Sequence, residues 1–138
     1  MKMLVSRIAM SAFITTLTAL RLHAADVNDL NYEVRGDTVT IISCDRAASG
    51  EMVIPAEIEG KPVTSIVFEA FMHCQSLTAV VIPEGVKSIR KGTFAYCQNL
   101  RSVVIPDTVT SIWNGAFAYC NSLVKADLPA NLRNLGDR

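Results

Sequence analysis

VKSIRKGTFAYCQNLRSVVIPDT, residues Val86–Thr108, occurs in close variants on both sides of itself. The preceding copy is VTSIVFEAFMHCQSLTAVVIPEG, Val63–Gly85, and the following copy is VTSIWNGAFAYCNSLVKADLPAN, Val109–Asn131. Each copy begins 23 residues after the previous one. Self-similarity at such a period is typical of a solenoid, in which each repeat packs mainly on its neighbours. The sequence therefore predicts a repeat architecture with a continuous core.

The three copies place apolar side chains at fixed positions, which we expect to form the core. These positions are Val63/Val86/Val109, Ile66/Ile89/Ile112, Phe71/Phe94/Phe117, Cys74/Cys97/Cys120, Leu77/Leu100/Leu123, Val80/Val103/Ala126 and Ile82/Ile105/Leu128. The order Leu-x-x-Val-x-Ile is that of a leucine-rich repeat, and its alternating end predicts a short strand that pairs in parallel with the neighbouring copies. The proline that follows each strand ends it, because proline cannot donate to the ladder. Val-x-Ser-Ile predicts a second extended segment on the other side of the coil.

The segment before the copies predicts a β-hairpin. Leu30, Tyr32 and Val34 alternate with polar residues, and residues 38–42 read as a second strand after a Gly36-Asp37 turn. Such a hairpin would cover the open end of the solenoid. The predicted fold class is therefore an α/β-type solenoid, mostly β, with a parallel sheet and an N-terminal β-hairpin cap.

The chain divides into four predicted regions. Residues 1–25 read as a signal peptide, with basic residues, an apolar run and a small-residue end. Residues 26–62 form the cap, which contains the hairpin, a degenerate repeat that ends at Val53-Ile54-Pro55, and a loop over 56–62. Residues 63–131 hold the three repeats, and 132–138 start a truncated fourth.

Charge and composition exclude two classes of protein. The full chain has 13 basic and 13 acidic residues. Removal of residues 1–25 takes away three basic residues and no acid, which leaves 10 basic and 13 acidic residues and a formal charge of −3. The chain has no basic stripe, so nucleic acid is a poor partner. No second long apolar segment follows the signal peptide, which argues against an integral membrane protein.

The cysteines and the histidine of the repeats are expected to be structural. Cys74, Cys97 and Cys120 recur at the repeat period with no Cys-x-x-Cys pattern, so we expect buried free thiols rather than a metal site. Cys44 lies outside this ladder, and its pattern allows a free or a bridged thiol. His73 shares a position with Tyr96 and Tyr119, which predicts a stacked rim. No catalytic set is visible, and we predict no enzyme activity, cofactor or metal.

The copies resemble the BspA-like leucine-rich repeat family of bacterial surface proteins. The resemblance rests on Ile89…Gly92-Thr93-Phe94…Cys97-Gln98-Asn99-Leu100…Val103-Val104-Ile105-Pro106 and the matching residues of the other copies. It implies a secreted or cell-surface solenoid that binds proteins, including host extracellular matrix proteins, without catalysis. The alternative is an incomplete fragment of a longer repeat array with a structural role only. A carbohydrate-binding role is weaker, because the aromatic ledge is thin.

Candidate protein-binding residues occupy the outward positions of the predicted strands and one position elsewhere. They are Ala79, Val81, Arg101, Ser102, Val104, Lys125, Asp127 and Trp113. Exposed apolar residues on a rigid sheet can form an interaction patch, although strand propensity alone also explains valine there. Arg35-Gly36-Asp37 is the tripeptide that integrins recognise on exposed turns. Backbone chemistry at a hairpin turn is the favoured explanation of this tripeptide, and adhesion is the alternative.

Overall fold

The computed structural model describes residues 24–137, so the predicted signal peptide lies almost wholly outside the described residues. The described chain is mostly β, with one 3-10 turn, η1 (Val27–Asp29). The strands are β1 (Leu30–Arg35), β2 (Thr38–Cys44), β3 (Gly50–Val53), β4 (Glu57–Ile58), β5 (Lys61–Ile66), β6 (Leu77–Val81), β7 (Ser88–Ile89), β8 (Ser102–Val104), β9 (Ser111–Ile112), β10 (Lys125–Asp127) and β11 (Asn134–Leu135).

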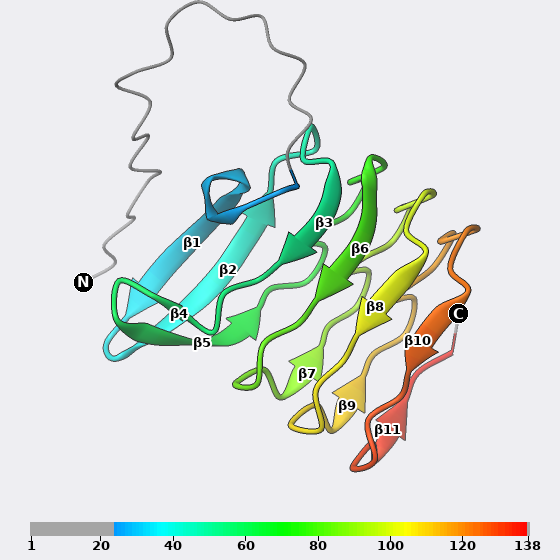
Figure 1. The fold of residues 1–138 in the computed structure, drawn as a ribbon. Coiled ribbons are helices and arrows are strands. Elements are labelled where there is room, and N and C mark those ends of the chain that lie inside the picture. The colour runs from blue at the N-terminus through cyan, green and yellow to red at the C-terminus, as the bar shows by residue number, and fades with distance from the viewer. Residues whose placement is uncertain (1–23, 138) are drawn as a thin grey trace, which may run out of the picture.

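Two parallel sheets form the walls of the coil (Figure 1). One has the order β3-β6-β8-β10, and the other has the order β7-β9-β11. Each turn of the chain contributes one strand to each wall, as the alternating end of the repeat and the Val-x-Ser-Ile segment predicted. The predicted mostly β solenoid with leucine-rich repeat geometry is confirmed.

The N-terminal end is covered by the predicted hairpin. β1 and β2 are antiparallel and joined by a turn at Gly36, whose φ is +59°. β2 then pairs in parallel with β5, in a four-stranded sheet of order β1-β2-β5-β4 that is separate from the two walls. The loop expected over residues 56–62 contains a second, tight hairpin of β4 and β5. Glu59 and Gly60 both have positive φ, the conformation that a two-residue hairpin turn requires.

The first and middle copies supply the best-covered part of the core. All predicted inward residues of these two copies are buried, and the following are 0 % exposed: Val86, Ile89, Phe94, Cys97, Leu100, Val63, Phe71, Cys74 and Leu77. The phenylalanine rings stack along the coil, with centroids 5.1 Å apart for Phe71–Phe94 and 5.4 Å apart for Phe94–Phe117. The core therefore runs continuously from one copy to the next.

The third copy departs from the predicted burial. Ala126 and Leu128 were expected in the core, but both are exposed. Phe117, Cys120 and Leu123 are only partly buried. The reason is geometric: β11 covers β9 of this copy, where Val109 and Ile112 are buried, but within residues 24–137 no strand pairs with the outer edge of β10. A residue at a given repeat position is therefore buried where the adjacent turn packs against it and exposed where none does.

A left-handed turn recurs ahead of each phenylalanine. Gly92 and Gly115 have φ of +65° and +66°, and Glu69 adopts the same conformation with φ +58°. The first copy therefore keeps the turn although it lacks the glycine, at the steric cost that a side chain meets in this region.

We expect Gly92→Ala to destabilise the protein by about 1–2 kcal/mol, because alanine is strained at this φ. A Cβ at Gly92 would also lie 3.0 Å from Cγ of Glu69. Gly115→Ala is the matched control, since its nearest contact is Ala118 at 3.8 Å and only the backbone strain remains. Urea unfolding of the two variants measures the cost of the backbone strain and the added cost of the contact with Glu69. Equal stability of Gly92→Ala and the wild type would contradict the strain.

Candidate functional site

The outward face of the β3-β6-β8-β10 sheet brings the predicted strand residues together. Parallel pairing aligns them in two rows across the four strands. One row contains Glu51, Ala79, Ser102 and Lys125, and the other contains Val53, Val81, Val104 and Asp127. We call these eight residues the sheet face.

An apolar strip runs along the second row. Val53 and Val104 are each 54 % exposed, and Val81 lies between them in register. The sequence analysis identified Val81 and Val104 but missed Val53, because its copy is degenerate. The alignment of Val53-Ile54-Pro55 with Val81-Ile82-Pro83 was the signal that could have placed it on the same row.

Charged groups border the strip at the C-terminal end of the sheet. The Lys125 ammonium lies 3.5 Å from the Asp127 carboxylate, and both side chains are largely exposed. Arg101 is exposed just before β8, and its amide donates to the carbonyl of Thr78. An exposed ion pair of this kind adds little stability, so these charges are free to contact a partner.

Trp113 lies apart from the sheet face. It follows β9 in the other wall, where its amide donates to the Ile89 carbonyl. A hollow of about 440 Å³ lies beside it, lined also by Arg133, Leu135 and Gly136. The predicted protein-binding residues therefore lie on two separate surfaces.

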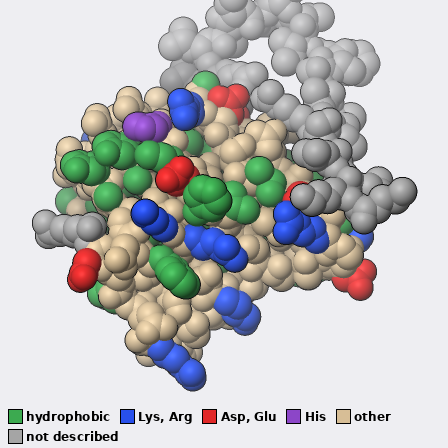
Figure 2. All heavy atoms as spheres, turned by 180° about the vertical axis from the view of Figure 1, so that it is seen from behind, with side chains coloured by type: hydrophobic (Ala, Val, Ile, Leu, Met, Phe, Trp, Pro, Cys, Tyr) green, Lys and Arg blue, Asp and Glu red, His purple; other side chains and the backbone are tan. Residues whose placement is uncertain are grey.

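Figure 2 shows the molecule from behind, where basic side chains are spread among apolar ones and form no single apolar strip.

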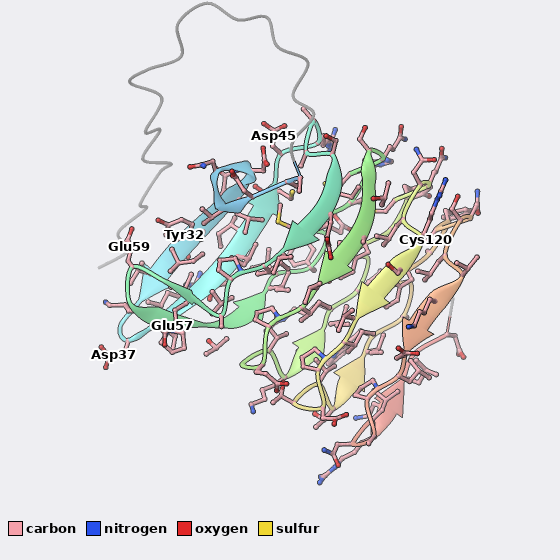
Figure 3. The ribbon with its side chains drawn as sticks, viewed as in Figure 1. Tyr32, Asp37, Asp45, Glu57, Glu59 and Cys120 are labelled. Atoms are coloured by element: carbon pink, nitrogen blue, oxygen red, sulfur yellow. The ribbon has the colours of Figure 1, made fainter. Side chains whose placement is uncertain are left out.

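The Arg35-Gly36-Asp37 tripeptide lies on the exposed β1–β2 turn, with Asp37 at its tip (Figure 3). The Arg35 guanidinium is bound to the Glu33 carboxylate at 2.6 Å, and Lys61 donates to the Gly36 carbonyl. These two contacts hold the hairpin turn in place. The adhesive role of the tripeptide stays a prediction.

The four cysteines are free thiols in the structure, and all but Cys120 are buried. The Cys97 thiol donates to the Phe71 carbonyl, and the Cys120 thiol donates to that of Phe94, so each thiol ties one turn to the preceding one. Burial raises the pKa of Cys97 to about 12, with a further contribution from neighbouring Cys120 and Cys74. Burial likewise raises the pKa of Cys120.

Cys44 and Cys74 titrate as a pair. The hydrogen bond to Cys74 and burial raise the pKa of Cys44. The same hydrogen bond lowers the pKa of Cys74. Within residues 24–137, no group of three or more histidine, cysteine, aspartate or glutamate side chains is placed to hold a metal ion.

His73, Tyr96 and Tyr119 form the predicted stacked rim. The ring centroids are 4.7 Å apart for His73–Tyr96 and 4.6 Å apart for Tyr96–Tyr119, with nearly parallel planes. All three residues have positive φ, a conformation uncommon outside glycine. Stacking occupies both faces of the Tyr96 ring and one face each of His73 and Tyr119. Tyr119, at the end of the stack, is 62 % exposed.

A second hollow, of about 340 Å³, lies on the cap. Figure 3 labels Tyr32, Glu57 and Glu59 of its lining. Its lining includes Leu30 and Ile58 on an apolar floor and Glu57 at the rim. The Tyr32 hydroxyl donates to Glu59 at 2.8 Å beside it. Burial, together with this carboxylate, raises the pKa of Tyr32.

No helix among the described residues has the length and apolar character to cross a membrane.

These features define a leucine-rich repeat solenoid with one flat, partly apolar sheet face. The sequence matches the family described as BspA type Leucine rich repeat region (6 copies) over residues 56–138. The chain therefore belongs to the BspA-type leucine-rich repeat family. A search of curated proteins finds no match.

Three solved structures have a similar fold. A leucine-rich repeat protein from Bacteroides capillosus is 31 % identical with a TM-score of 0.70, covering 78 % of this chain and 84 % of that one. The leucine-rich repeat protein of T. pallidum is 23 % identical with a TM-score of 0.71, covering 83 % of this chain and 64 % of that one. A leucine-rich cell surface protein from Faecalibacterium prausnitzii is 21 % identical with a TM-score of 0.52, covering 78 % of this chain and 49 % of that one.

Proposed function

We propose that the protein is a non-catalytic binding module, secreted or held at a bacterial cell surface, whose sheet face binds proteins of the host extracellular matrix. The observation that carries the proposal is the register of Val53, Val81 and Val104, which places three valines in one row on a rigid parallel sheet. Leucine-rich repeat solenoids present extended surfaces of this kind to protein partners.

The chemistry of the sheet face favours a protein partner. An apolar centre bordered by charges is the usual organisation of a protein interface, with desolvated contacts in the middle and polar contacts at the rim. The strip supplies the centre, while Glu51 at one end and Lys125 and Asp127 at the other supply charged margins. Because the strands are held by ladders on both sides of β6 and β8, little conformational entropy is lost on binding.

We expect Val104→Glu to weaken binding to a matrix protein by at least about tenfold, because it places a charge in the apolar strip. Surface plasmon resonance against a panel of immobilised extracellular matrix proteins measures the effect. Phe68→Glu is the matched control, since Phe68 is 62 % exposed, against 54 % for Val104, but lies outside the sheet face. Equal losses in both variants would remove the sheet face from the proposal. A folded wild type that binds no protein of the panel would favour a purely structural role.

Secretion has its own test. Ala25 is buried, and its amide donates to the Ser49 carbonyl at 2.9 Å. Cleavage after Ala24 keeps this contact, whereas cleavage after Ala25 removes it. We expect an extracellular protein that begins at Asp26, the boundary that the sequence predicts, or at Ala25, which keeps this contact, measured by N-terminal sequencing of the secreted fraction. Protein that stays in the cell with residues 1–25 attached would contradict the proposal.

A further inference from the structure

The outer face of the β7-β9-β11 wall places a cation beside an exposed aromatic ring. β7 and β9 end at the buried residues Ile89 and Ile112, which pair with one another across the two strands. The next residue in each case, Arg90 or Trp113, is exposed on the outer side. Arg90 and Trp113 therefore occupy neighbouring positions of one row. The amide of Gly136 donates to the Ile112 carbonyl, so the following turn already runs beside Trp113, whose side chain is still 59 % exposed.

A second row of side chains crosses the start of the same strands. The amide of Thr110 donates to the Lys87 carbonyl, and the amide of Arg133 donates to the Thr110 carbonyl, each at 2.9 Å. The backbones of Lys87 and Arg133 are therefore two strand spacings apart, roughly 10 Å, with Thr110 between them. Lys87 is exposed although turns pack on both sides of its own, so this position faces outward along the wall. Cations that lie one or two repeats apart in the sequence thus gather on one surface.

Hydrogen-bonding groups lie between the two rows. Ser88 pairs with Ser111 across β7 and β9, and Ser111 pairs with Asn134 across β9 and β11. The two serines are one position before the buried isoleucines, so they lie on the outer side of the wall. The Asn134 side-chain amide donates to the Ser111 hydroxyl at 3.2 Å. A hydroxyl both donates and accepts, so each serine can bind a further polar group. We define the cationic face by six residues: Lys87, Ser88, Arg90, Ser111, Trp113 and Arg133.

The cationic face has a positive charge on a chain that is otherwise acidic. It contains three basic and no acidic residues, whereas residues 26–138 together contain 10 basic and 13 acidic residues. Among residues 24–137, ion pairs lie on the cap hairpin and on the sheet face, so none neutralises the cationic face. Glu69 and Asp137 belong to the turns that follow the wall strands rather than to the rows themselves. Positive charge fixed on a rigid surface attracts anionic ligands.

We propose that the cationic face binds an acidic polysaccharide, a sugar chain that carries sulfate or carboxylate groups. Lys87, Arg90 and Arg133 supply charge complementarity to these groups along roughly 10 Å of the wall. The serine hydroxyls can bond sugar hydroxyls. The Trp113 ring offers a flat apolar surface with an N–H at its edge, on which a sugar ring can stack. The cationic face and the sheet face lie on different walls, so this proposal goes beyond the protein binding proposed above and does not depend on it.

The arrangement favours a sugar chain over a nucleic acid. Proteins that bind single strands of nucleic acid present several aromatic side chains, on which successive bases stack. The cationic face has one aromatic side chain, that of Trp113, set among cations and hydroxyls. A nucleic acid therefore serves as the competitor in the test below.

Titration with heparin, a sulfated polysaccharide, tests the role of the charges. Isothermal titration calorimetry of the purified protein should give a dissociation constant that rises with ionic strength, because salt screens exposed charges. Lys87→Gln and Arg90→Gln should each raise this constant about twofold to fivefold, and together by about tenfold or more. Arg101→Gln is the matched control, since it removes an exposed cation from the other wall and should leave the affinity for heparin unchanged.

Trp113 supplies a direct readout of the bound ligand, because it is the only tryptophan of the chain. Heparin should change its fluorescence on binding, and Trp113→Ala should raise the dissociation constant by about fivefold or more. Heparin binding without a fluorescence change, or an equal loss in Arg90→Gln and Arg101→Gln, would place the ligand elsewhere and overturn the proposal. So would a wild type that binds no heparin. A single-stranded oligonucleotide that displaces heparin at equal concentration would overturn the assignment to a polysaccharide.

Discussion

Phe94→Ala is expected to destabilise the protein by about 3–5 kcal/mol, the range found when a buried phenylalanine is truncated. The ring is fully buried and lies between Phe71 and Phe117, so the substitution removes two stacking contacts and leaves a cavity in the middle of the core. Domains of this size are stable by only about 5–15 kcal/mol, so the loss is a large part of the total. Denaturant unfolding followed by circular dichroism measures it.

Two other phenylalanines provide the comparison for Phe94→Ala. Phe68 is 62 % exposed, so Phe68→Ala should change the free energy of unfolding by no more than about 0.5 kcal/mol. Phe117 has the same position in the repeat as Phe94 but is only partly buried, so Phe117→Ala should have an intermediate effect. If Phe94→Ala and Phe68→Ala had the same midpoint, the continuous aromatic core would be contradicted.

The repeat period was sufficient to predict the core wherever a turn has neighbours on both sides. Val86, Ile89 and Leu100 are fully buried, as their recurrence indicated. The prediction was wrong at Ala126 and Leu128, which occupy the repeat positions of buried Val103 and Ile105. Burial in a solenoid is a property of adjacent turns, and a periodic pattern assigns it to every copy alike. The pattern therefore identifies inward positions but gives no measure of how well each is covered.

Backbone strain could not be predicted from residue type. Glycine at residues 92 and 115 is a recognisable signal for positive φ, but Glu69 adopts the same conformation without it. His73, Tyr96 and Tyr119 are likewise left-handed, although such bulky residues rarely are. These three residues also stack their rings across successive turns. Such a contact becomes visible only when the turns are placed beside one another.

The candidate site was predicted in part. Alternation along each strand correctly separated Val104 on the outward side from buried Val103 and Ile105. The two rows of the sheet face could be defined only once the register between neighbouring strands was known. That register placed Val53 beside Val81, and the structure placed Trp113 away from the sheet face. Sequence alternation thus assigns the face of each residue, while register decides which residues share a patch.

The buried thiol of Cys97 should make the protein sensitive to alkaline pH. Its pKa is raised from 9.0 to about 12, so the folded state keeps a proton that the unfolded state loses. The stabilisation is fully present below pH 9.0 and is lost as the pH rises towards about 12, with a total of about 4 kcal/mol for three pKa units. Cys97→Ala removes this titration, so its stability should fall less steeply across the same range, although it starts lower. Urea unfolding under reducing conditions at several pH values compares the two slopes. Parallel slopes would show that other groups govern the alkaline transition and that Cys97 is not the residue whose burial opposes ionisation.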